Sequence, residues 1–158
     1  MDERLSIPHG AGGTLRLRVP PDPRFAGYVR QRVETFTAVN NVPQADGAEF
    51  VTAVSEALAN AVEHSRTKDE IEVACWLVDG NQLLATVVDS GVGFDATAVI
   101  EDSALPEPLA ERGRGLPLMR RFTDLFALRS EPGAGTRVVL GRFLRYAEQN
   151  GDGAAITG

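Results

Sequence analysis

Three polar residues recur at four-residue intervals in the segment EALANAVEHS, which spans residues 56–65. Glu56, Asn60 and His64 would lie along one side of a helix, because residues four apart are neighbours on a helical surface. Asparagine is a poor interior helix former, since its short amide competes for backbone hydrogen bonds. The stripe therefore either faces solvent, as on any amphipathic helix, or packs against something polar. For His64 we expect a structural or helix-end role.

A first glycine cluster, VVDSGVGFDA, follows a run of strand-forming residues. Asp89 at the end of that run could accept a hydrogen bond from an exocyclic amine, and Gly91 and Gly93 would let a flat ring approach the backbone. A simple turn-forming aspartate is the alternative. The spacing matches a dinucleotide-binding turn only weakly, because no helix is expected directly after it. A phosphate loop of the lysine-containing type is excluded, since the single lysine, Lys68, follows no glycine loop.

A second glycine cluster, ERGRGLPLM, leads into a helix-forming segment. Glycines before a helix N-terminus expose free N–H donors at the positive end of the helix dipole, which favours an anion site. Arginines in and after the cluster add positive charge to an acidic protein. An ordinary loop-to-helix junction with a solvated basic face is the alternative.

The hydrophobic pattern predicts the elements that position these residues. Alternation over 14–19 predicts a strand, and helical spacing predicts helices over 21–39 and about 45–64. Strand-like runs at 70–78 and 82–89 flank a hairpin signal, DGN. A polar, proline-bearing stretch then precedes a helix over 116–126 and a hairpin over 126–144. This order predicts an α+β two-layer sandwich, in which a mixed, mostly antiparallel sheet carries about three helices on one face.

Length and charge restrict the class of protein. A chain of 158 residues suggests one domain, expected over 14–146, with a flexible N-terminal arm at 1–13 and a flexible C-terminal tail at 147–158. The net charge of −6 argues against direct contact with nucleic acid. The single cysteine, Cys75, excludes an internal disulfide. The sequence has neither a signal peptide nor a run of membrane-spanning length, so we expect a cytoplasmic protein with no membrane contact.

Four motifs, taken in order, resemble one family. SEALANAVEH is similar to the N box of the GHKL superfamily of ATP-binding domains (the Bergerat fold), and DSGVGF is similar to its first glycine box. ERGRGLPLMRRFTD resembles its second glycine box, and PGAGTRVVL its final glycine-threonine strand entry. Within the superfamily, the chain resembles the anti-sigma-factor serine/threonine kinases of partner-switching systems over roughly residues 14–145.

The resemblance implies a role for each polar residue of the motifs. Asn60 would ligate a Mg²⁺ ion that bridges the ATP phosphates, and Glu56 would be the general base that takes a proton from the attacking hydroxyl. Asp89 would hold the adenine amino group with support from Thr136. The remaining nucleotide-binding positions are Gly91 and Gly93 against the nucleotide, a lid over 95–112, and a phosphate cradle at Gly113, Arg114, Gly115 and Leu116, with Arg112 or Arg114 near the γ-phosphate.

The implied function is that of an ATP-dependent protein kinase and anti-sigma factor. It would phosphorylate a small antagonist protein of the STAS type and sequester a sigma factor. A non-catalytic, ATP-dependent binding switch is the alternative, and Glu56 favours the enzyme because a pure binding module needs no base. A nucleotide-binding domain detached from a larger regulator is a weaker third interpretation. We also expect a homodimer, because helices on one side of the sheet leave its other face, which carries apolar residues, uncovered.

Overall fold

The computed structural model describes residues 13–94 and 119–145. The first half of the chain forms a strand, a short 3-10 helix and two α-helices: β1 (Gly13–Val19), η2 (Pro23–Phe25), α1 (Ala26–Val39) and α2 (Gln44–His64). The second half forms two hairpins separated by a helical segment at 119–121: β2 (Ile71–Val78), β3 (Gln82–Asp89), β4 (Leu125–Ser130) and β5 (Thr136–Phe143).

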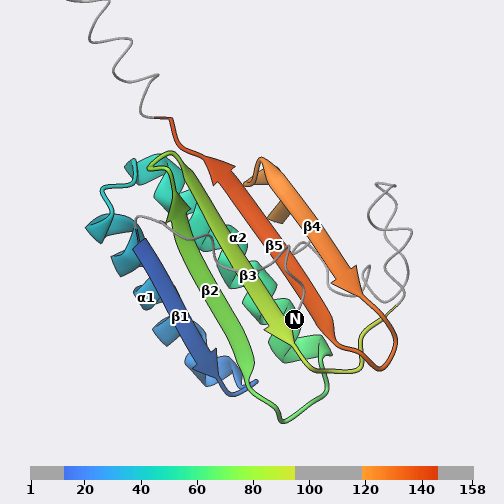
Figure 1. Cartoon of the computed structure of the whole chain (residues 1–158). Helices are drawn as coiled ribbons and strands as arrows, with labels where there is room; N and C mark the ends of the chain where they lie inside the picture. The colour runs from blue at the N-terminus through green and yellow to red at the C-terminus, as the bar shows by residue number, and fades with distance from the viewer. Residues whose placement is uncertain (1–12, 95–118, 146–158) are drawn as a thin grey trace, which may run out of the picture.

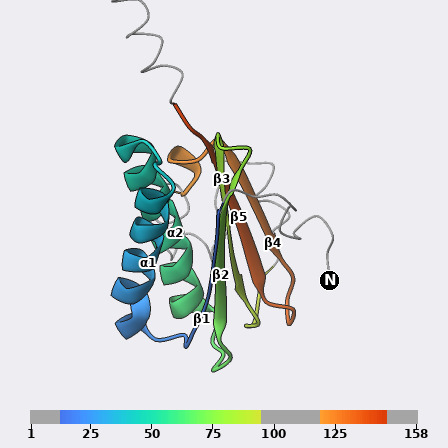
Figure 2. The same cartoon turned by 60° about the vertical axis from the view of Figure 1, so that its left-hand side comes forward.

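The strands form one sheet with the order β1-β2-β3-β5-β4 (Figure 1). Each neighbouring pair of these described strands is antiparallel. Figure 2 shows α1 and α2 together on one face of the sheet, with the segment that precedes β4 on the same side. The predicted α+β two-layer architecture is confirmed. None of the helices in the described ranges is long and apolar enough to cross a membrane.

Local sequence explains the start of η2 and the turn between β2 and β3. Asp22 accepts a hydrogen bond from the backbone N–H of Arg24 at 2.9 Å and so caps η2, with Pro23 in its first turn. The first α-helix therefore begins at Ala26, later than predicted. Three residues, 79–81, connect β2 to β3. Asp79 and Gly80 both have positive φ, of 52° and 72°, and the Asn81 N–H donates to the Val78 carbonyl at 3.1 Å, so they are the two central residues of a tight turn of the type common in hairpins.

The predicted helix over 116–126 is wrong at its C-terminal end. Within the described residues the helix ends at 121, and β4 begins at Leu125. Asp124 starts the pairing with β5: its N–H donates to the Gly141 carbonyl at 2.8 Å, and its carboxylate accepts from the Phe143 N–H at 2.7 Å. These two hydrogen bonds hold the chain against β5, so the residues that follow pair with it as a strand.

The core lies between the helices and the inward face of the sheet. Each helix contributes apolar residues at helical spacing, such as Val29, Val33 and Phe36 of α1. Cys75 lies on the inward face of β2 and is fully buried. Burial raises the pKa of its thiol to about 12, so it remains a neutral core side chain at neutral pH.

The outward face of the sheet carries apolar residues as well. Cross-strand neighbours Trp76 and Leu84 lie on it, and Gly141 of β5 is opposite both Leu84 and Leu125. A Cβ at Gly141 would come within 2.9 Å of Leu84 and 3.0 Å of Leu125, so this glycine lets the two leucines close over the sheet. Leu125 and Phe143 are 44% and 49% exposed. This row of apolar side chains, from Trp76 to Phe143, is called the outer apolar face below.

Candidate functional site

A small cavity lies where α2 crosses the ends of the central strands. Three polar residues line it: Asn60 of α2, Asp89 at the end of β3 and Thr136 at the start of β5. The rest of the wall is apolar and consists of Ala57, Ala61, Val87, Met119, Leu128 and Val138. The three polar residues are all buried. The structure thus brings together three of the residues that the motifs singled out.

The backbone after β3 is held by the end of α2. The Gly91 N–H donates to the Asp89 carboxylate at 2.8 Å, and the Val92 N–H donates to the Ser65 carbonyl at 2.8 Å. A Cβ on Gly91 would lie 2.1 Å from that same Ser65 carbonyl oxygen, so only glycine fits here. The first glycine box therefore packs on the C-terminus of α2. Because Asn60 lies on that helix, this contact fixes the position of Asp89 relative to Asn60.

The second glycine of the box packs against the hairpin between β4 and β5. Gly93 has a φ of +65°, and a Cβ on it would lie 2.0 Å from the Glu131 carbonyl oxygen. The Gly133 N–H donates to the Val92 carbonyl at 2.6 Å. Both glycines thus have a packing role that the sequence did not indicate, and their predicted contact with a nucleotide stays a prediction.

Ser130 is a site residue that sequence reasoning missed. It is the last residue of β4 and lies opposite Thr136, which in turn lies opposite Asp89 on the other neighbouring strand. Its Oγ is 2.8 Å from the Thr136 hydroxyl and 3.0 Å from the Gly135 carbonyl oxygen, and it accepts from the Phe94 N–H at 2.9 Å. A serine two residues before Pro-Gly-x-Gly-Thr is the signal that was available, but serine is common beside turns.

Glu56 lies apart from this cavity, one helical turn before Asn60. It is half-buried and lines a groove of about 520 Å³ between α1 and α2, together with residues such as Arg30, Glu34 and Thr52. Within the described residues, its carboxylate makes no side-chain hydrogen bond or ion pair. His64 is the last residue of α2, as its expected helix-end role requires.

The second glycine box lies outside the described residues. This applies to Arg112, Gly113, Arg114, Gly115 and Leu116, and to the predicted lid over 95–112. After the box, the described residues resume at Met119 in a helical segment over 119–121, and Met119 forms part of the cavity wall.

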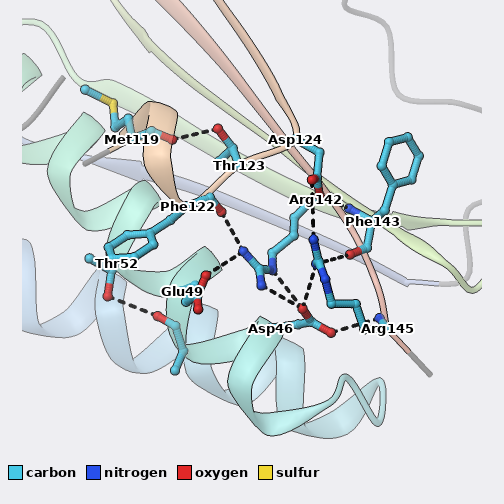
Figure 3. Close-up of polar contacts among 11 residues, drawn as sticks. Asp46, Glu49, Thr52, Met119, Phe122, Thr123, Asp124, Arg142, Phe143 and Arg145 are labelled. Atoms are coloured by element: carbon cyan, nitrogen blue, oxygen red, sulfur yellow. Dashed lines mark hydrogen bonds and ion pairs between the residues drawn. The ribbon is translucent and has the colours of Figure 1, made fainter. Parts of the chain in front are cut away.

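A buried ion-pair cluster ties the end of that helical segment to α2 and β5, and sequence reasoning also missed it (Figure 3). Arg142 of β5 donates to Asp46 at 2.9 Å and to Glu49 at 2.7 Å, both on α2, and to the Phe122 carbonyl at 2.9 Å. Asp46 also accepts from the backbone N–H of Arg145 at 3.0 Å. The available signal was the alternation of side chains along a strand. Arg142 lies two and four residues after the buried Leu140 and Val138 of β5, so it faces inward as they do.

The polar and apolar side chains that line the cavity fit an aromatic ring that carries an amino group. Carboxylate and hydroxyl oxygens of Asp89 and Thr136 can accept hydrogen bonds from an amino group, while alanine, valine, leucine and methionine side chains would contact a flat apolar ring. The cavity itself has a volume of only about 10 Å³, close to what one water molecule needs. Admission of a ring therefore requires a wall to move, and the flexible Met119 side chain is the most adaptable part of it.

The site also fits a magnesium ion that is held mainly by the phosphates of a bound nucleotide and by water. No group of three or more histidine, cysteine or acidic side chains converges within the part of the chain that the structure describes. Magnesium is commonly bound through one or two protein oxygens, with phosphate oxygens and waters completing its octahedron. The amide oxygen of Asn60 could supply one such ligand.

Comparisons with known proteins agree with this geometry. Curated relatives include the anti-sigma F factor of Clostridium acetobutylicum, 32% identical over 91 residues that cover 56% of this chain and 64% of that protein. They also include the serine-protein kinase RsbW of Bacillus velezensis, 27% identical over 139 residues that cover 82% of this chain and 85% of the relative. Among solved structures, the RsbU and RsbW domains of a Mycobacterium tuberculosis protein match with a TM-score of 0.64 at 24% identity, over 84% of this chain and 33% of that one.

A family model covers almost the whole described domain. The model for the histidine kinase-like ATPase domain matches residues 19–142, which include both glycine boxes, Asn60, Asp89 and Thr136. With the two-layer fold and the buried cavity at the ends of β3 and β5, this match shows that the chain belongs to the histidine kinase-like ATPase domain family.

Proposed function

We propose that the cavity formed by Asn60, Asp89 and Thr136 is the base-recognition end of an ATP site. The observation that carries the proposal is the placement of two buried acceptors, Asp89 and Thr136, beside Asn60 in a wall whose other residues are apolar. Adenine offers a matching amino group on a flat ring, and membership in an ATPase domain family supports the same ligand. Asn60, in the wall of the same cavity, would hold Mg²⁺ through its amide oxygen, and the ion would supply positive charge to the phosphates.

The replacement of Asp89 by asparagine tests this site. Asparagine keeps an oxygen that can accept from Gly91, but it removes the negative charge and presents N–H donors to the amino group. Because hydrogen bonds to charged groups contribute about 1.5–3 kcal/mol, ATP affinity should fall about ten- to a hundredfold, and the preference for ATP over GTP should shrink. Calorimetry with Mg²⁺ present measures both. Unchanged affinity and selectivity would remove Asp89 from the site.

We further propose that the protein is a cytoplasmic serine/threonine kinase and anti-sigma factor. Its relatives carry the names anti-sigma F factor and serine-protein kinase RsbW, and Glu56, the proposed general base, is half-buried one helical turn before Asn60. The substrate would be a hydroxyl of a small antagonist protein of the STAS type, and the sequestered partner a sigma factor. A non-catalytic, ATP-dependent switch for a protein partner is the second candidate, because nucleotide binding requires Asn60 and Asp89 but not Glu56.

Electrostatic repulsion would drive release of the phosphorylated antagonist. A phosphoryl group adds roughly −1.5 to −2 charge at neutral pH, and the protein already carries −6. The phosphorylated antagonist should therefore dissociate and leave the surface to the sigma factor. In a pull-down with the immobilised sigma factor and ATP, unmodified antagonist should displace the protein, and a phosphomimetic form should not. The Asp89→Asn variant is the control and should lose the dependence on ATP. Equal displacement by both forms of the antagonist would contradict the proposed switch.

We also propose a homodimer that buries the outer apolar face. Leu125 and Phe143 are about half exposed there, beside Leu84, and apolar patches of this kind commonly mark protein contacts. Light scattering should give the mass of a dimer for the wild type and of a monomer for a variant with glutamate at both positions. Val39→Glu is the matched control, because Val39 is 73% exposed on the helix layer, and it should stay dimeric. A strictly monomeric wild type at high micromolar concentration would refute the proposal.

A further inference from the structure

Three hydrogen-bonding partners surround the Ser130 hydroxyl, and their chemistry decides which atom donates. The Phe94 N–H donates to Ser130 Oγ at 2.9 Å. The Gly135 carbonyl, 3.0 Å away, can only accept, and the Thr136 hydroxyl, 2.8 Å away, can do either. Ser130 has one proton. The arrangement that satisfies every group has Ser130 donating to Gly135 and Thr136 donating to Ser130.

This arrangement determines what Thr136 presents to the cavity. Because its proton is directed to Ser130, only lone pairs of its oxygen remain for a ligand. Ser130 and Thr136 are both buried, at 8% and 9% exposure, so a different arrangement would leave the Gly135 carbonyl without the serine proton. Gly135 packs closely on the backbone at the end of β3: its φ is +79°, and a Cβ on it would lie 2.2 Å from the Asp89 carbonyl oxygen, so only glycine fits here.

We infer that Ser130 is a positioning residue that makes Thr136 an obligate acceptor and thereby selects 6-amino purines over 6-oxo purines. The inference rests on the proposed ATP site. Asp89 alone cannot make the distinction, because its carboxylate can accept either from the amino group of adenine or from the N1–H of a 6-oxo purine. A 6-oxo group would, however, face the lone pairs of Thr136, and the repulsion would be unrelieved in a buried site.

ATP and ITP are suitable probes, since they differ in the group at position 6 and the proton at N1. With Mg²⁺ held constant, calorimetry should show that the wild type prefers ATP. In Ser130→Ala, Thr136 can rotate and donate to the 6-oxo group, so the ratio of ITP to ATP dissociation constants should fall about five- to tenfold. In Thr136→Val the ratio should fall as well. Addition of Ser130→Ala to Thr136→Val should leave the ratio unchanged, because Ser130 acts through the hydroxyl that has been removed.

The outcomes separate this inference from a purely structural role of Ser130. If Ser130→Ala weakens ATP and ITP by the same factor, the inference is wrong and Ser130 only supports the hairpin. If that variant does not fold, Thr136→Val decides, and a full preference for ATP in Thr136→Val overturns the inference. A wild type that binds neither nucleotide, with the Asp89→Asn variant equally inactive, would refute the ATP site itself.

Discussion

Replacement of Glu56 by glutamine is expected to lower the rate of phosphotransfer to a protein substrate by roughly 10²–10⁴-fold. Glutamine keeps the length and polarity of the side chain but cannot take a proton from the attacking hydroxyl. Glu56 is half-buried on α2, one turn from Asn60, and its carboxylate makes no hydrogen bond or ion pair within the described ranges. The substitution should therefore leave the fold and the affinity for ATP nearly unchanged, which separates a role in catalysis from a role in binding.

The measurement is the initial rate of transfer from labelled ATP to the antagonist, together with calorimetric ATP affinity. Glu63→Gln is the matched control, because Glu63 lies on the same helix, two turns from Glu56, but is exposed. It should retain the wild-type rate. Equal rates for Glu56→Gln and the wild type would mean that Glu56 is not the base. A wild type with no transfer but with intact ATP binding would favour the non-catalytic switch.

Much of the fold could be predicted because local patterns and tertiary packing agree. The alternation of 14–19, the helical spacing of Val29, Val33 and Phe36, and the Asp79-Gly80 turn each specify one element, and each element is present. The end of the helix before β4 could not be predicted in the same way. Residues 122–126 continue a helical pattern, and the bonds of Asp124 with Gly141 and Phe143, distant in sequence, decide that the chain turns into the sheet.

The candidate site shows the same division. Asn60, Asp89 and Thr136 could be singled out because motif order placed them at a helix, a strand end and a strand start, and the structure brings these three positions to one cavity. Ser130 could not be singled out, since its importance depends on the register that sets it opposite Thr136. Glycines 91 and 93 were assigned to the ligand, whereas their closest neighbours are backbone atoms of Ser65 and Glu131.

Arg142 represents the largest feature that the motifs did not reveal, and its loss should affect stability most. Arg142 lies on β5, and its guanidinium joins this strand to two other parts of the domain. It donates to Asp46 and Glu49 of α2 and to the carbonyl of Phe122, just after the helical segment at 119–121. The side chains of Arg142 and Asp46 are only 8% and 3% exposed. A buried ion pair costs desolvation when it forms, but removal of one partner leaves the other as an uncompensated buried charge.

Arg142→Met keeps much of the side-chain volume and removes every one of these bonds. Asp46 would then retain only Arg145, whose side chain is 46% exposed, and the Phe122 carbonyl would lose its donor. We expect the free energy of unfolding, measured in urea, to fall by about 3–5 kcal/mol.

Arg145→Met is the matched control, because it removes a more exposed partner of the same carboxylate, and it should lower the free energy of unfolding by about 1 kcal/mol or less. Asp46→Asn combined with Arg142→Met should cost less than the sum of the two single changes, since the buried charge disappears with its partner. A loss below about 1 kcal/mol for Arg142→Met, or equal losses for Arg142→Met and Arg145→Met, would show that the cluster does not hold the three elements together.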